Sequence, residues 1–83
     1  MIRAEQIRAA RALLRWSQAD MAERSGVSVP TIKRLEAMDG ELSGHTATIQ
    51  SLTTCIEAAG VEFIPENGGG AGARLSSPKR ATE

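Results

Sequence analysis

The side chains of this 83-residue chain that are best placed to contact another molecule lie between residues 29 and 34. They include a lysine, an arginine and a threonine beside a valine and a proline. Cations attract anionic groups, and the planar guanidinium of arginine can donate two parallel hydrogen bonds to a pair of acceptors. Threonine adds a hydroxyl, whereas valine and proline offer only apolar contact. The residues are Val29, Pro30, Thr31, Lys33 and Arg34.

Two short helices joined by a tight turn are predicted to position these side chains. Ser17 begins the first helix as a hydroxyl cap in an S-x-x-D pattern, and Gly26 supplies the positive φ that a sharp reversal needs. Ser28 caps the second helix, residues 28–37, whose first turn suits Pro30 because its N–H would have no partner there. An apolar inner face leaves the contact residues on the outer face. The inner face consists of Val27, Ile32 and Leu35.

Residues 17–36, S-Q-x-x-M-A-x-x-S-G-V-S-x-x-T-I-x-R-L-E, resemble the helix-turn-helix of the phage Cro/repressor-like family (xenobiotic-response-element type). The resemblance covers about a quarter of the chain tightly and, with the flanking helices, most of residues 1–60. It implies a mainly helical, four-helix DNA-binding domain with a C-terminal strand or hairpin. The implied function is a transcriptional regulator that binds double-stranded DNA as a homodimer. The alternative is a helical hairpin with ordinary core residues.

If the second helix enters the major groove by its N-terminal turn, each outward residue has an expected role. Arg34 is the candidate for a bidentate contact with guanine, and Val29 and Pro30 are candidates for apolar contact with a thymine methyl. Thr31 and Lys33 could contact bases or backbone, with Lys33 favoured for phosphate. The alternative for the two cations is a solvated helix face. Since two of the five side chains cannot hydrogen-bond, shape readout is expected to contribute.

Three more residues belong to the expected DNA contact: Gln18, Ser28 and His45. The resemblance implies a phosphate contact for Gln18, which stands beside a helix N-terminus, and the alternative is an exposed glutamine. Ser28 begins the helix that reads the groove. His45 is interpreted first as a surface loop residue and second as a phosphate contact. It has no accompanying cluster of Cys, His or acids, so no metal site and no cofactor are expected.

The first helix, residues 3–15, combines an apolar stripe with several arginines. Arg11 lies close to the stripe, and a buried charge requires a partner. The resemblance implies an ion pair with Glu36 that acts as a structural clamp, and the alternative is two solvated charges. Trp16, the single tryptophan, is expected to plug the core rather than to stack on a base.

The charge balance is unusual for a nucleic-acid binder, because the net charge is zero and the pI is about 6.6. Residues 1–36 carry seven Lys or Arg against four acids, a net +3, and residues 37–83 carry three against six, a net −3. Asp39 and Glu41, in the loop of residues 38–45, would repel phosphate. These features support an alternative function, a protein-interaction module such as an antitoxin or an antagonist of another regulator, with weak or no DNA binding.

Residues 46–59 are predicted to form a fourth helix that completes a domain of residues 1–60. Residues 61–65 alternate like a strand that returns after a glycine-rich turn, but a lone hairpin is only marginally stable. Segment 61–75 is therefore expected to dimerise with a second copy through Val61, Phe63 and Ile64, because open strand edges invite pairing. The alternative is a strand packed on its own helical domain. Residues 76–83 are expected to be a flexible tail.

The sequence argues against an enzyme and against a membrane protein. A chain of 83 residues leaves little room for a pocket, and no nucleophile and base are combined in it. The single Cys55 cannot form an internal disulfide, and no apolar run is long enough for a signal or a membrane span. We expect a cytoplasmic protein, associated with the nucleoid when bound to DNA, whose partners are DNA, a second copy and, in the alternative reading, another protein.

Overall fold

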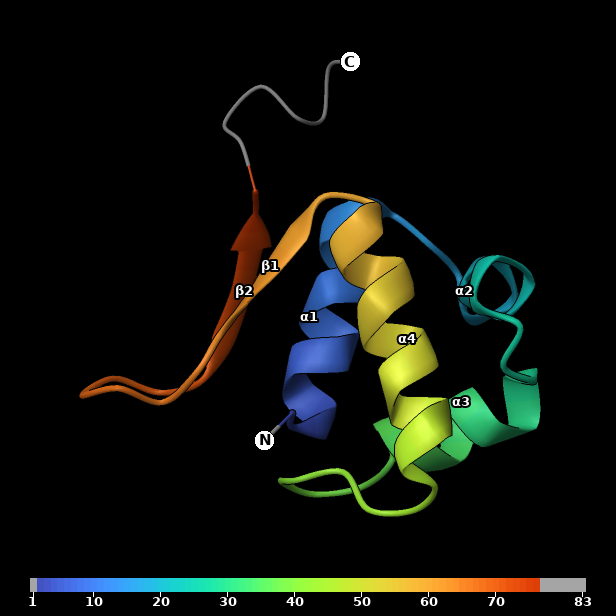
Figure 1. Cartoon of the computed structure of the whole chain (residues 1–83), viewed down its shortest axis with the longest axis horizontal. Helices are drawn as coiled ribbons and strands as arrows, with labels where there is room; N and C mark the ends of the chain where they lie inside the picture. Colours follow the sequence, from blue (N-terminus) through green and yellow to red (C-terminus); the bar gives the residue numbers. More distant parts are fainter. Residues whose placement is uncertain (1, 77–83) are drawn as a thin grey trace.

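The computed structural model describes residues 2–76, which form four helices followed by a two-stranded antiparallel sheet. The predicted mainly helical fold with a C-terminal hairpin is confirmed. The hairpin lies on one side of α1 and α4, and α2 lies on the other side (Figure 1). Apart from Ser76, the predicted tail is outside the described residues. The elements are α1 (Ala4–Leu14), α2 (Gln18–Ser25), α3 (Val29–Glu36), α4 (Thr46–Ala58), β1 (Val61–Ile64) and β2 (Gly72–Leu75).

Hydroxyl caps and left-handed residues set the helix boundaries. The Ser17 hydroxyl accepts from the backbone N–H of Asp20 at 2.9 Å, and the Asp20 carboxylate accepts from the N–H of Ser17 at 2.9 Å. Gly26, with a φ of 79°, ends α2 in the conformation that glycine adopts without strain. Arg15 ends α1 with a φ of 59°, which is uncommon for a residue with a side chain. The predicted first helix, residues 3–15, therefore exceeds the observed one by one residue at each end.

Each helix contributes one apolar face to a single core. Trp16 is half-buried and packs against this core, as expected, while the Arg24 guanidinium lies 5.0 Å from the centre of its ring. The largest side chains with less than 2% exposure come from all four helices and from β1. They are Ile7, Met21, Ile32, Leu35, Leu52, Ile56 and Val61.

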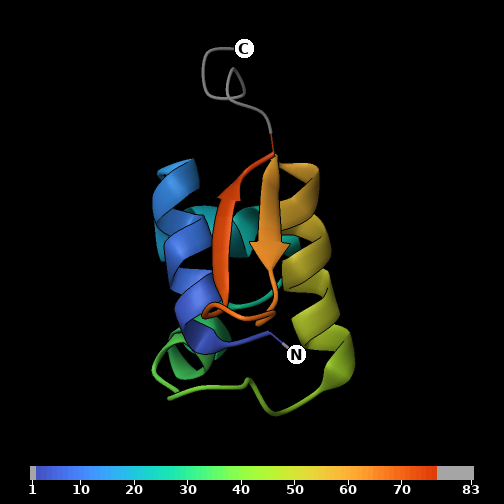
Figure 2. The same ribbon diagram turned by 90° about the vertical axis from the view of Figure 1, so that its left-hand side faces the viewer.

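The hairpin covers the space between α1 and α4, with β2 beside α1 and β1 beside α4 (Figure 2). Its strands pair with Val61 opposite Leu75. Beyond this pair, the backbone N–H of Ser76 donates to the carbonyl of Gly60 at 2.8 Å. The hydrogen-bonded hairpin therefore extends one residue into the segment that was predicted to be a tail.

The hairpin packs on its own helical domain, which was the alternative to the predicted dimer contact. Val61 is 1% exposed and belongs to the core, and Phe63 packs partly buried against it. The buried amide of Gln6, in α1, donates to the carbonyls of Ile64 and Gly72 at 3.1 and 2.9 Å. The side chain of Val61 is thus covered by the helices of its own chain, and dimerisation through the hairpin stays a prediction. Strand alternation turns Val61 and Phe63 to the inner face, where the helices cover them.

Candidate nucleic-acid interface

The helix α3 buries its apolar residues and presents its cations to solvent. Ile32 is 0% exposed and Leu35 is 1% exposed, whereas Lys33 and Arg34 are both exposed. Residues three apart share one face of a helix, so Ile32 and Leu35 face the core while the two cations project away from it. The fold therefore provides the outward cationic face that the sequence predicted for this helix.

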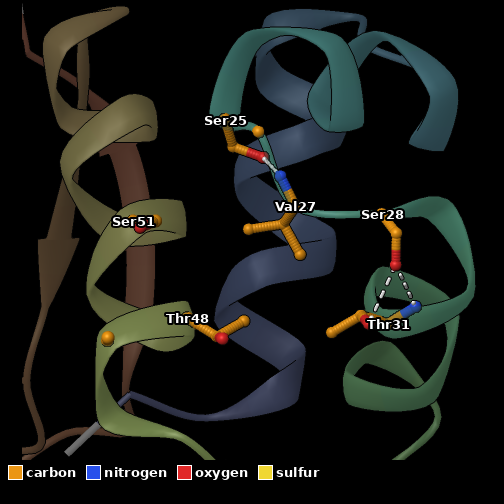
Figure 3. Close-up of a pocket in the computed structure, with 8 residues that line it drawn as sticks. Ser25, Val27, Ser28, Thr31, Thr48 and Ser51 are labelled. Atoms are coloured by element: carbon orange, nitrogen blue, oxygen red, sulfur yellow. Dashed lines mark hydrogen bonds between the residues drawn. The ribbon is translucent and has the colours of Figure 1, made fainter.

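The first turn of α3 is fixed by its own hydroxyls (Figure 3). The Ser28 hydroxyl accepts from the backbone N–H of Thr31 at 3.4 Å and donates to the Thr31 hydroxyl at 2.9 Å. Val29 and Thr31 are half-buried, whereas Pro30 is exposed. Among the three residues 29–31 of this turn, Pro30 is therefore the one with an exposed side chain.

An open polar cavity of about 300 Å³ lies between this turn and α4 (Figure 3). On one side of it, the Ser25 hydroxyl accepts from the backbone N–H of Val27 at 3.1 Å. None of the lining residues is charged or a histidine, so the cavity contains no acid–base pair for catalysis. The lining residues are Ser25, Gly26, Val27, Ser28, Thr31, Ala47, Thr48 and Ser51.

Glu36, the last residue of α3, is buried and connects three helices. Its carboxylate accepts from Nε and Nη2 of Arg11 at 2.9 and 3.0 Å and from Nε2 of Gln18 at 3.1 Å. Arg8 donates to the backbone carbonyl of the same residue. Hydrogen bonding to the carboxylate raises the pKa of Arg11, so the guanidinium stays charged. The ion pair expected from the sequence is present in the structure, and it holds α3 against α1 and α2.

The side chain of Gln18 is directed into the protein rather than toward solvent. It is half-buried, and its amide nitrogen donates to Glu36. The second N–H of this amide and the backbone N–H groups of Gln18 and Ala19 have no protein acceptor among residues 2–76, whereas the N–H of Asp20 donates to Ser17. Arg8 was not singled out from the sequence. The available signal was its spacing, one turn before Arg11, which puts both arginines on the same side of α1.

The loop between α3 and α4 is held by the N-terminal segment. The backbone N–H of Ala4 donates to the carbonyl of Gly40, and that of Leu42 donates to the carbonyl of Ile2, both at 2.9 Å. Leu42 is 4% exposed and anchors the loop in the core. The acidic loop that follows α3 therefore has a path fixed by backbone hydrogen bonds at its middle.

Arg34 reaches from α3 to the end of this loop. A Cβ atom built on Gly44 would lie 3.8 Å from Nη2 and 3.9 Å from Nη1 of Arg34. Among residues 2–76, Arg34 makes no ion pair and no side-chain hydrogen bond. His45 is the exposed N-cap residue of α4, and its side chain makes no cap hydrogen bond. The fold thus brings Arg34 and the residue before His45 close together.

The described residues also bear on metal binding, membrane spans and thiol reactivity. Within residues 2–76, no three His, Cys, Asp or Glu side chains are grouped so that they could hold a metal ion. None of the helices in that range has the length and apolar character needed to cross a membrane. Burial raises the pKa of the Cys55 thiol, which favours the protonated, unreactive form.

Comparison with known protein families agrees with this geometry. The family model HTH_3, described as Helix-turn-helix, matches residues 7–52, more than half of the chain. The match starts in α1, ends in α4 and includes all of α2 and α3. No curated protein matches the chain significantly. HTH_3 is a family of DNA-binding regulatory domains of the Cro/C1 type and not an enzyme family, and this chain belongs to it.

Proposed function

We propose that this protein is a sequence-specific transcriptional regulator that binds double-stranded DNA as a homodimer, with α3 in the major groove. The observation that carries the proposal is the contrast between the two faces of α3. Lys33 and Arg34 are exposed and unpaired among residues 2–76, while Glu36 fixes the helix from behind. Because the backbone of α3 is already held in place, binding needs to order only the side chains of its cations and not the helix itself. Such a protein would act in the cytoplasm, at the nucleoid.

Each accessible residue of α3 has a role that suits its chemistry. Arg34 donates two hydrogen bonds to O6 and N7 of a guanine, and Lys33 neutralises a phosphate. Pro30, with the half-buried Val29 beside it, contacts a thymine methyl. Thr31 accepts from Ser28 and keeps its own O–H as a donor, but its half-buried side chain contributes less than the exposed Arg34. Much of the specificity at this helix therefore rests on Arg34.

The flanking contacts are made to the DNA backbone rather than to bases. The free amide N–H of Gln18 and the backbone N–H groups at the start of α2 face one phosphate. Ser28 acts mainly as the cap of α3, and His45 lies in the loop that follows Arg34, where a phosphate contact is open to it. These contacts position α3 without specifying sequence.

The dimer uses the outer side of the hairpin. The helices cover its inner face, so the surface open to a second copy consists of the strand edges and the outer face. Ile64 lies on this outer face, next to an exposed Glu62–Arg74 ion pair of 3.0 Å. Two-fold pairing of hairpins would place two α3 helices on half-sites about 34 Å apart on the duplex.

The groove contact is tested by comparing Arg34→Ala with Lys33→Ala on sequences selected from random duplex DNA. Arg34→Ala should cost on the order of 1 to 3 kcal/mol and relax the preference at one base position. Lys33→Ala should weaken binding to all sequences alike and reduce the salt dependence by about one counterion. If both variants lose affinity equally and without regard to sequence, the assigned roles are wrong.

The dimer is tested by sedimentation of the protein and of Ile64→Glu. The wild-type protein should sediment at twice the 8.8 kDa chain mass, and Ile64→Glu should sediment at the chain mass. Thr54→Glu, which adds the same charge on the exposed side of α4, is the control and should leave the dimer intact. A monomeric wild-type protein, or a dimeric Ile64→Glu, would contradict dimerisation through the hairpin.

A second candidate function is a protein-interaction module, for instance an antitoxin or an antagonist of another regulator. The observation that favours it is the acidic loop after α3, where Asp39 and Glu41 are both exposed. Salt dependence separates the two functions, because an affinity for DNA that rests on phosphate contacts must fall as salt rises. Absence of selected sequences at both low and high salt would favour the protein-interaction module.

A further inference from the structure

Gly44 lies beside the two terminal nitrogens of the Arg34 guanidinium. The two atoms within 4 Å of the position of a Cβ on this residue are Nη2, at 3.8 Å, and Nη1, at 3.9 Å. At Gly40, in the same loop, the equivalent position lies 3.5 to 3.8 Å from both terminal nitrogens and from Cζ of Arg3. The two glycines of the loop thus lie beside two different guanidinium groups, Gly44 beside that of Arg34 and Gly40 beside that of Arg3.

The space in front of an arginine fork is the space that a bidentate partner occupies. Two acceptors such as O6 and N7 of guanine must lie about 2.9 Å from the two terminal nitrogens. A Cβ at position 44 would already lie in van der Waals contact with the same two nitrogens, so a side chain there would shield one side of the fork from the acceptors. Glycine leaves this space open, and its φ of 132° is rarely adopted by residues with a side chain.

The charges around Arg34 leave its fork free as well. Asp39 and Glu41 belong to the same loop, yet within residues 2–76 neither pairs with Arg34. Glu41 is tied into a backbone bridge with Arg3, which directs that part of the loop toward the N-terminal segment. An acid that captured Arg34 would have to be displaced before a base could bind.

We propose that Gly44 is a positioning residue for sequence readout, because its missing side chain keeps the fork of Arg34 open to the edge of a guanine. The proposal rests on the major-groove role of Arg34 proposed above. It places one determinant of specificity outside α3, in the loop that leads to α4. Position 44 then controls discrimination at the base pair that Arg34 reads and at no other.

The experiment measures the affinities of four variants for two DNA duplexes. One is the selected site, and the other is the same site in which the base pair whose guanine Arg34 contacts is replaced. The variants are Arg34→Ala, Gly44→Ala, Gly40→Ala and the double variant Arg34→Ala/Gly44→Ala. Gly40→Ala is the matched control, because Gly40 is in the same loop and also has a positive φ, of 81°. Thermal unfolding of every variant measures the strain that an added methyl group causes in the loop.

Arg34→Ala should reduce discrimination at its base pair by roughly 5- to 150-fold, the equivalent of a lost bidentate contact. Gly44→Ala should reduce discrimination at the same base pair, by about 5-fold or more, and should have no further effect on it in the double variant. Gly40→Ala should leave discrimination within about 2-fold. The positioning role of Gly44 is wrong, and the groove contact of Arg34 still stands, if Gly44→Ala keeps full discrimination. The same conclusion follows if the two glycine variants lose affinity equally and without regard to sequence. If Arg34→Ala itself keeps full discrimination, the proposed groove contact fails, and the positioning role of Gly44 fails with it.

Discussion

Removal of the Glu36 carboxylate is the sharpest test of how α3 is held. Glu36→Ala deletes the acceptor of three hydrogen bonds, two from Arg11 and one from Gln18. The side chain of Arg11 is 25% exposed, so most of its length would lie beside the core with no anionic partner. Loss of one partner of a buried ion pair costs about 3 to 5 kcal/mol, and the partial hydration of Arg11 places the expected cost at about 2 to 3 kcal/mol.

A cost of this size is large for so small a domain. The whole free energy of unfolding of 83 residues is on the order of 4 to 12 kcal/mol. Glu36→Ala should therefore lower the Tm by roughly 10 to 20 °C in thermal unfolding followed by circular dichroism. Urea unfolding should show a lower midpoint with an unchanged m-value, because the surface exposed on unfolding stays the same.

A double-mutant cycle separates the ion pair from the general loss of packing. Arg11→Met should also cost about 2 to 3 kcal/mol, since it leaves the Glu36 carboxylate with Gln18 as its one side-chain donor. Glu36→Leu, measured alone and together with Arg11→Met, closes the cycle, and the double variant should be at least as stable as either of these two single variants because neither charge remains without its partner. Strictly additive costs, or a cost below about 0.5 kcal/mol for Glu36→Ala, would refute this account of Glu36.

Two further predictions concern the hairpin and the start of α2. Gln6→Leu should leave two hairpin carbonyls without their donor and lower the free energy of unfolding by about 1 to 3 kcal/mol. Hydrogen exchange of the hairpin amides should then accelerate before that of the helices. Arg74→Ala, at an exposed site of the same hairpin, is the control and should change neither the stability nor the exchange. Hydrogen bonds with Ser17 lower the pKa of Asp20 below its usual 3.8, so its ionised form stabilises the fold above that pH, and the contribution is lost as the pH falls through the lower folded value. Asp20→Asn should therefore weaken the acid-induced loss of stability below about pH 3.8, and an NMR titration that places the Asp20 pKa at or above 3.8 would contradict this.

The helix-turn-helix could be predicted from the sequence because its signals are local. Ser17, Gly26 and Ser28 each act within three or four residues of their own position, through a cap hydrogen bond or a backbone conformation. The family match over residues 7–52 agrees with this prediction. Sequence spacing also separates the inner face of α3 from its outer face, since the helix period alone determines which residues share a side.

The position of the hairpin could not be predicted in the same way. The alternation of Val61 and Phe63 indicates a strand with one apolar face, but it does not say which surface covers that face. The answer depends on Gln6, which is 58 residues from Ile64 in sequence and donates to its carbonyl. Nothing in the sequence around Gln6 indicates this hydrogen bond, because its acceptor is distant in sequence. The hydrogen bond from Gln18 to Glu36 could not be predicted for the same reason.

The neutral charge of the chain is easier to reconcile with DNA binding once the cations are divided by their partners. Of the seven cations in residues 1–36, four already have a partner within the protein. Arg3 pairs with Glu5 and Arg11 with the Glu36 carboxylate, while Arg8 donates to the Glu36 carbonyl and Arg24 lies near the ring of Trp16. Counterion release then offers only a few phosphate contacts for each chain, which is a weak basis for affinity by itself. In the proposed dimer a second copy would double that number and fix the spacing of two reading helices, so we expect binding through α3 to depend on dimerisation as well as on local contacts. The cations without such a partner among residues 2–76 are Arg15, Lys33 and Arg34.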